Sequence, residues 1–149
     1  MGQVIIRRVV RRDRAEWLRM RDRLWPGSRR DHELEIDRFF TGGGGDVAVF
    51  VAMRSDGRLG GFVEASPRPY AEGCSTSPVG YVEGWWVDPD LRRTGVGRRL
   101  IAAAEAWARA RGLVEMASDA ELVNEPSHAA HRALGYREVE RLVCFRKRL

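Results

Sequence analysis

Two arginines and two glycines lie close together directly after a predicted strand, in the run RRTGVG at residues 92–97. A long amphipathic pattern follows, so the run falls at a helix N-terminus, where backbone N–H groups lack partners and the helix dipole is positive. Glycine at positions 95 and 97 lets an anion approach this backbone without a Cβ in the way. The run therefore predicts a binding site for a pyrophosphate group.

Other phosphate-binding motifs fit these glycines less well. No Lys-Ser or Lys-Thr pair follows this run or the glycines at 42–45, which excludes a P-loop. A dinucleotide-binding fold does not fit either, because the glycine spacing differs and no βαβ unit precedes the run. A turn that merely needs glycines is the structural alternative.

The elements that position this run are predicted from hydrophobic periodicity and turn residues. Asp13 caps the first helix, Pro26-Gly27 ends it, and a hairpin turn at Asp56-Gly57 joins two strands. Residues 67–78 form a long polar loop. The predicted strands are 3–10, 47–54, 59–65, 79–87, 114–118 and one or two within 138–148, and the other predicted helices are 30–40, 94–112 and 126–134. This order indicates an α/β (α+β) fold, a mixed sheet of six to seven strands flanked by about four helices.

Length and composition limit the protein class. A chain of 149 residues with 44% hydrophobic residues suits one domain over 1–149. No apolar stretch approaches the ~18 residues of a membrane span, and the N-terminus lacks a signal profile, so we expect a cytoplasmic protein with no membrane partner. Cys74 and Cys144 form no metal or disulfide framework and are expected to be reduced, and no metal is expected.

The net charge of +5 admits nucleic acid, an anionic membrane surface or an anionic small molecule as partner. An arginine-rich RNA-binding module would need a continuous basic face and steeply salt-dependent binding. That hypothesis leaves the glycine run and the acidic strand ends unexplained, so we expect no nucleic acid.

The pattern Arg92-x-x-Gly95-x-Gly97, with the order of elements around it, resembles the GNAT family of acyl-CoA-dependent N-acetyltransferases. The resemblance implies acetyl-CoA as co-substrate and a strand before the glycine run that diverges from its neighbour to admit the pantetheine arm. Gly84, a strand-weakening residue, is consistent with a bulge that starts this divergence. The cofactor-binding residues implied are Trp85, Trp86 and Val87 at the thioester, Arg92, Arg93, Thr94, Gly95, Val96, Gly97 and Arg98 at the pyrophosphate, and Asn124 on the CoA arm.

The sequence departs from the family pattern at one position. Counted from Asn124, the tyrosine that usually reprotonates the CoA thiolate falls on His131, whereas Gly135-Tyr136 fits. An imidazole can serve as a catalytic acid near pH 7. Either His131 takes that role or a tyrosine elsewhere or water does, and a purely structural histidine is the alternative.

Several local strings resemble one branch of the family, the aminoglycoside 6'-N-acetyltransferases. They are Leu24-Trp25-Pro26, Tyr70, Ser77-Pro78, Glu83-Gly84, residues 116–119, and residues 131–136 with Glu140 beyond them. This resemblance implies an aminoglycoside substrate and a homodimer. It implies substrate contacts at Trp25, Tyr70, Glu83, Asp119 and Glu140.

The residue types suit that substrate, because carboxylates and aromatic faces bind ammonium groups. Glu83 and Asp119 lie near the ends of two predicted strands, in otherwise apolar or small-residue runs. An amine must lose a proton before it attacks, so Glu83 is the favoured base, with Asp119 second, directly or through a water. Neither cysteine lies in a recognisable Cys-His arrangement, so we expect direct attack without an acyl-enzyme. The alternatives are solvated or salt-bridged acids and, within the family, another acceptor such as a polyamine, an amino acid or a protein N-terminus.

Overall fold

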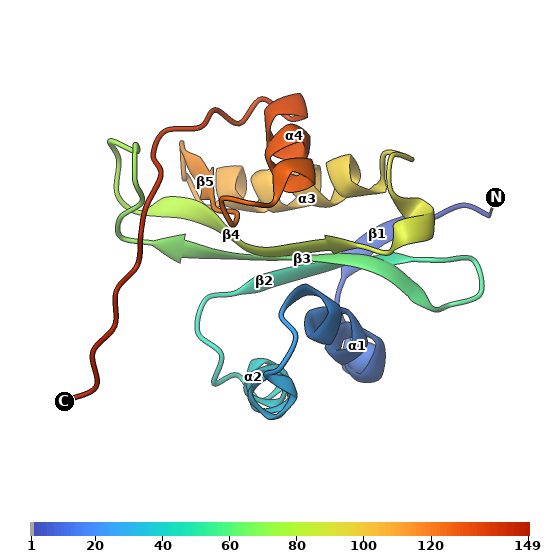
Figure 1. The fold of residues 1–149 in the computed structure, drawn as a ribbon. Coiled ribbons are helices and arrows are strands. Elements are labelled where there is room, and N and C mark those ends of the chain that lie inside the picture. The colour runs from blue at the N-terminus through green and yellow to red at the C-terminus, as the bar shows by residue number, and fades with distance from the viewer. Residues whose placement is uncertain (1) are drawn as a thin grey trace.

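A computed structural model of the protein describes residues 2–149 and contains one five-stranded sheet in the order β1-β2-β3-β4-β5 (Figure 1). Neighbouring strands pair antiparallel from β1 to β4, and β5 joins β4 in parallel. The strands are β1 (Ile5–Arg8), β2 (Ala48–Met53), β3 (Leu59–Arg68), β4 (Val79–Val87) and β5 (Met116–Ser118).

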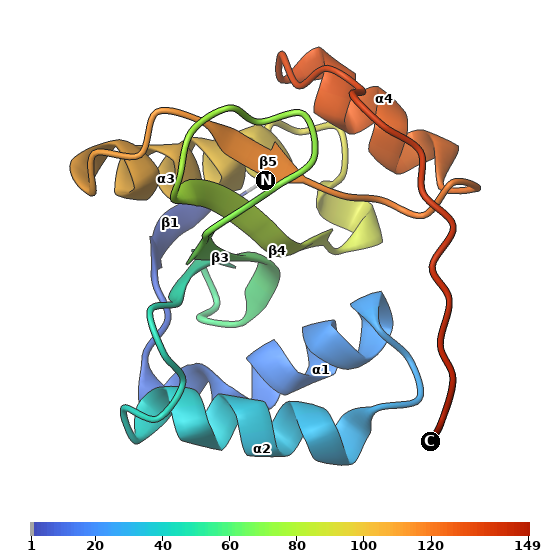
Figure 2. The same cartoon turned by 90° about the vertical axis from the view of Figure 1, so that its left-hand side faces the viewer.

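Helices cover both faces of the sheet (Figures 1 and 2). Helices α1 (Arg14–Leu24) and α2 (Arg29–Phe40) lie on one face, and α3 (Val96–Ala110) with α4 (Glu125–Ala133) lies on the other. Short 3-10 turns precede α1 (η1, Arg11–Asp13) and follow β4 (η2, Pro89–Leu91). The predicted mixed sheet with four flanking helices is thereby confirmed.

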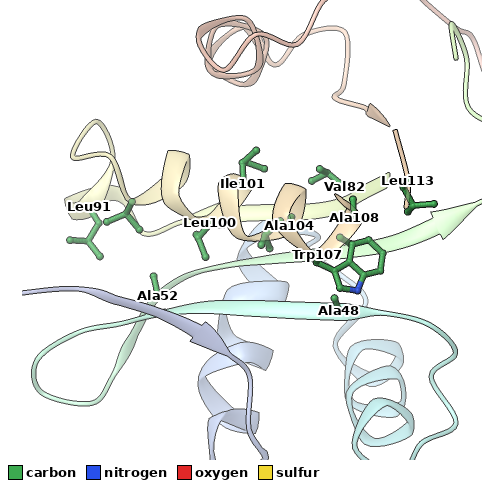
Figure 3. Packing of buried hydrophobic residues seen from close by; sticks show 13 residues of the cluster. Ala48, Ala52, Val82, Leu91, Leu100, Ile101, Ala104, Trp107, Ala108 and Leu113 are labelled. Carbon is green, nitrogen blue, oxygen red and sulfur yellow. The ribbon is translucent and has the colours of Figure 1, made fainter. Parts of the chain in front are cut away.

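The hydrophobic core has two layers because strand side chains alternate between the faces. In β2, Ala48 and Ala52 pack with Ala104 and the rest of the buried face of α3 (Figure 3), whereas Val49 and Val51 face α1 and α2. Small alanines in β2 leave room for α3 to lie close to the sheet. The sheet therefore separates two hydrophobic clusters, one under α3 and one under α1 and α2.

Strands β4 and β5 pair over only three positions, of which Val82 with Ser118 is the last. Strand β4 continues five residues further to Val87 without a β5 partner, so the two strands diverge as the resemblance implied. A register shift places Ala65 opposite Val82 and Glu64 opposite Gly84, which leaves Glu83 as the extra residue of a bulge. The bulge predicted at Gly84 is thus present, one residue earlier, and it turns the Glu83 side chain toward α1 and α2.

Three expectations about strands are wrong. The sheet has five strands rather than six or seven, and residues 138–148 form none in the part of the chain that the structure describes. Those residues have no neighbouring strand to pair with, and Phe145 is 92% exposed. Strand β3 also runs on to Arg68 through Pro67, because its pairing with β2 ends at Ala65 and a proline is tolerated where one side of the strand is free.

No helix within residues 2–149 has the length and apolar character needed to cross a membrane. Within the same residues, no group of three or more His, Cys, Asp or Glu side chains could hold a metal ion. Cys74 and Cys144 are both free thiols.

Candidate active site

The glycine run, residues 92–97, leads into the N-terminal end of α3, which we call the helix mouth. Gly95 adopts φ of 91° with open space where a Cβ would be, and Arg93 has φ of 62°, an uncommon value for a residue with a side chain. The first helical bond runs from the Arg99 N–H to the Gly95 carbonyl, so the amides of residues 96–98 have no acceptor within the helix. These amides and the positive helix end suit a phosphate group.

A buried donor without a partner lies beside this mouth. The indole Nε1 of Trp85 makes no hydrogen bond, and a Cβ added at Gly97 would come within 3.0 Å of the Trp85 ring. Glycine is therefore required at 97 for packing against Trp85 as well as for anion approach. An unsatisfied buried donor, free helix amides and the open space beside Gly95 are features that a bound coenzyme A could use, so the residues present fit this group.

Three residues predicted to bind the cofactor instead make side-chain hydrogen bonds to the protein's own backbone. The Arg92 guanidinium lies 4.8 Å from the Trp86 ring centre, and its Nε donates to the Val87 carbonyl at 2.9 Å. The Thr94 hydroxyl donates to the Leu91 carbonyl, and the Asn124 side chain caps α4 by accepting from the Ser127 amide. Arg93 and Arg98 remain exposed at the mouth of α3.

The predicted carboxylates belong to a hydrogen-bonded group on the α1 and α2 side of the sheet. Arg68 donates to both oxygens of Glu83, at 2.8 and 2.5 Å, and the Ser66 hydroxyl donates to Glu83 at 2.6 Å. The Arg68 guanidinium carbon lies 3.6 Å from the Tyr81 ring centre, and the Tyr81 hydroxyl donates to Asp119 at 2.6 Å. The structure therefore brings Glu83 and Asp119 into one connected network.

Ionisation within this network follows from its contacts. Burial acts to raise the pKa of Glu83, but the hydrogen bonds from Arg68 and Ser66 outweigh it and hold that pKa below the ordinary value. Burial and the adjacent Asp119 raise the pKa of Tyr81. A charged Glu83 with a lowered pKa is a better anchor for an ammonium group than a base that removes its proton.

Trp25 ends α1 and reaches the same face. A Cβ added at Gly84 would lie 2.4 Å from its ring, so the absence of a side chain in the bulged strand makes room for the indole. The buried Arg21 guanidinium lies 5.1 Å from the Trp25 ring centre, and His32 Nε2 donates to the Trp25 carbonyl at 2.9 Å. Arg21 is in turn paired with buried Glu64 at 2.7 Å. The ion pair fixes the Arg21 guanidinium, and Arg21 in turn contacts the Trp25 ring and so fixes its position.

His131 lies on the opposite face of the sheet, with α3 and α4. Its Nδ1 donates to the Ser127 carbonyl at 2.7 Å, and its Nε2 is 2.8 Å from the Ser118 hydroxyl. The ring packs edge-on against Trp85 at 5.4 Å between centres. Ser118 is the last β5 residue paired with β4, so this pair lies where the two strands diverge.

Two predicted substrate contacts lie apart from the acidic network. Tyr70 is 66% exposed in the loop after β3, and Glu140 lies in the exposed segment after α4. Within residues 2–149, neither side chain makes a hydrogen bond or ion pair.

Sequence reasoning missed four side chains that complete the site: Ser66, Arg68, Tyr81 and Ser118. Ser66 and Arg68 alternate at the end of β3, and that alternation is the signal that was available. The predicted strand ended at Ala65, so this alternation was missed.

The fold and the site together define a class of protein. Residues 13–136 match the Acetyltransferase (GNAT) family, and the chain belongs to this family. The GNAT resemblance found in the sequence is thereby confirmed.

Named relatives show which members of the family the chain is similar to. The chain is 48% identical over 147 residues to an aminoglycoside N(6')-acetyltransferase type 1 of Klebsiella aerogenes, covering 97% of each chain. A protein of the same name from Stenotrophomonas maltophilia is 43% identical, with 95% of this chain and 91% of the relative covered.

Solved structures agree with these relatives. AAC(6')-Iy in complex with the bisubstrate analog CoA-S-monomethyl-acetylneamine has a TM-score of 0.90 and 37% identity, covering 99% of this chain and all of the other. The aminoglycoside antibiotic 6'-N-acetyltransferase AAC(6')-Ih from Acinetobacter baumannii has a TM-score of 0.90 and 35% identity, covering 99% of each chain.

Proposed function

We propose that the protein is an aminoglycoside 6'-N-acetyltransferase that transfers an acetyl group from acetyl-CoA to the 6'-amine of an aminoglycoside. The observation that carries the proposal is the divergence of β4 from β5. On one face of the sheet, this divergence lies next to the N-terminus of α3, which suits a pyrophosphate. On the other face it lies next to the carboxylates of Glu83 and Asp119. The names of the relatives support the same substrate and reaction.

In the proposed reaction the amine attacks the thioester carbonyl directly. The N–C bond forms, the C–S bond breaks, and the amine proton goes to a carboxylate, directly or through a water. Asp119 is exposed and accepts one hydrogen bond, from Tyr81, whereas Glu83 accepts three. These contacts support Glu83 as an anchor for an ammonium group, and we propose Asp119 as the base.

The departing thiolate needs a proton. The Ser127 carbonyl can only accept, so His131 Nδ1 donates to it. We propose that His131 in its imidazolium form passes the Nε2 proton to the Ser118 oxygen, 2.8 Å away, while the Ser118 hydroxyl gives its own proton to the thiolate, which leaves a neutral ring. Tyr136 is not placed for this role, because its hydroxyl donates to Glu105 and its pKa is raised by burial and by that carboxylate.

The proposal is tested by thiol release from acetyl-CoA with a panel of amines. We expect turnover with aminoglycosides that carry a 6'-amine and none with those that lack it. Glu83→Gln and Asp119→Asn should reduce turnover far more than acetyl-CoA affinity. Turnover with neutral or anionic amines, and none with kanamycin, would favour the alternative of another GNAT acceptor.

The biological role needs a separate measurement. Expression in a susceptible host should raise the minimal inhibitory concentration of kanamycin, and Asp119→Asn should abolish that increase. We also propose a cytoplasmic location, because the reaction uses acetyl-CoA.

We also propose a homodimer built with the segment after α4. This segment runs along the outside of the molecule to the C-terminus without a strand partner (Figures 1 and 2). It exposes apolar side chains, among them Val139, Val143 and Phe145, each more than half exposed, and a partner chain could cover such a surface. A second copy is the partner we propose for it. Phe145→Ser should convert a dimer to a monomer in sedimentation, and a monomeric wild type would refute the dimer.

A further inference from the structure

Most of the hydrogen-bonding capacity of Glu83 is used before any substrate binds. A carboxylate offers about four lone-pair positions. Two donors from Arg68 and the Ser66 hydroxyl occupy three of them, which leaves one on Oε2. An acceptor ammonium that needs Glu83 therefore meets a cation already in place.

Arg68 also offsets the negative charge of the whole acidic network. Its guanidinium stacks on Tyr81, whose hydroxyl is bonded to Asp119, so one fixed positive charge lies between two carboxylates. The pKa of Arg68 is raised by its hydrogen bonds to Glu83, with burial opposing them, so it stays charged. The network thus has a net charge of −1 rather than −2.

The geometry allows Arg68 to leave. The Arg68 side chain is 42% exposed, whereas Glu83 is 26% exposed. The β3 end that carries Arg68 has only β4 as a neighbour, because pairing with β2 ends at Ala65. By contrast, Arg21 and Glu64 are both less than a tenth exposed, so their ion pair is far less open to exchange with an incoming ammonium group.

We propose that Arg68 is an affinity-determining residue of the acceptor site, an internal cation that occupies Glu83 in the free enzyme and is released when an acceptor ammonium binds there. This inference rests on the proposed function, because it takes Glu83 as an ammonium anchor. Aminoglycoside binding is then an exchange of one cation for another. Its affinity is lower than the two carboxylates alone would provide.

The test is the KM for kanamycin of Arg68→Gln at several salt concentrations, with the KM for acetyl-CoA measured in parallel. Removing a half-exposed ion-pair partner should lower the kanamycin KM about two- to fivefold. The KM should also rise more steeply with salt than in the wild type, because the site carries one more uncompensated negative charge. The KM for acetyl-CoA should not change.

Two variants make the result specific. Arg58→Gln removes the same charge from the β2–β3 hairpin at the far end of β3, about 30 Å away along the strand, and should leave the kanamycin KM unchanged. Arg68→Lys keeps the charge without the two-pronged bond, and its salt dependence should match the wild type.

Each outcome bears on the proposal. An unchanged or higher kanamycin KM in Arg68→Gln would overturn it and make Arg68 a brace for Glu83 or a direct substrate contact. An equal decrease in Arg58→Gln would also overturn it, since the effect would then be one of net charge. A wild type that is inactive on every aminoglycoside refutes the proposed function instead, so the two failures are distinguishable.

Discussion

Replacing Arg21 with methionine should destabilise the protein strongly, because it leaves Glu64 as a buried charge without its partner. Arg21 donates to both Glu64 oxygens, at 2.7 and 3.1 Å, and both side chains are less than a tenth exposed. Only the Trp17 indole, at 2.9 Å, would still bind Glu64. Removing one partner of such a pair costs about 3–5 kcal/mol. For a domain of this size each kcal/mol lowers Tm by about 2–4 °C, so Tm should fall by about 6–20 °C.

The assay is urea unfolding of four proteins: the wild type, Arg21→Met, Glu64→Leu and the double variant. Replacing both charges with apolar groups of similar volume should recover more than half of the loss, since no unpaired charge remains. Burial raises the pKa of Glu64, and removing Arg21 leaves that effect unopposed by its main partner. The deficit of Arg21→Met should therefore shrink as the pH falls toward the ordinary carboxyl value of 4.5 and Glu64 takes up a proton.

The same substitution has a functional readout. Arg21 contacts the Trp25 ring and bonds to His32, which holds the Trp25 carbonyl, so the kanamycin KM should rise while the acetyl-CoA KM stays constant. The reasoning fails if Arg21→Met loses less than about 1 kcal/mol, or if the double variant is as unstable as the single one. Either result would mean that water reaches this pair.

Three further predictions address the site. Gly97→Ala places a methyl group 3.0 Å from the Trp85 ring, so the acetyl-CoA KM should rise about tenfold with the kanamycin KM unchanged, and steady-state kinetics check this split. The pKa of Glu83 is lowered, so its pair with Arg68 stabilises the fold above the ordinary value of 4.5 and less as the pH falls below it. In thermal melts the stability gap between the wild type and Glu83→Gln should close at acidic pH, and a constant gap would contradict the pairing. His131→Gln should lower kcat with both KM values unchanged, and an unchanged kcat would leave water as the proton source.

The part of the fold that could be predicted from sequence is the part determined locally. Apolar residues at helical spacing, a capping glycine and Asp56-Gly57 act through near neighbours, so α3 and the β2–β3 hairpin were placed correctly. The extent of β3 beyond Ala65 was not predictable in this way. Whether Pro67 is tolerated depends on where the neighbouring β2 ends, and that is a property of the assembled sheet.

The segment 138–148 is the opposite case, because a strand is predicted there and none forms. The sequence predicts one or two strands here, yet a strand needs a partner strand to satisfy its backbone groups. No such partner lies beside it in the described chain, and the segment remains extended and exposed.

The sequence by itself determined the chemistry available to this protein. It supplies a glycine-rich helix N-terminus for a pyrophosphate, and for an ammonium group one carboxylate within β4 and another just after β5. By the family resemblance, it also has a histidine at the position of the usual tyrosine. Only the tertiary structure decided which of these groups act together. The bulge at Glu83 and the end of pairing at Ser118 place the acids on one face of the sheet and His131 on the other. The partners Arg68 and Tyr81, which set the charge and ionisation of the acids, come from strand pairing. Contacts between residues distant in the chain depend on sheet register, which no local pattern specifies.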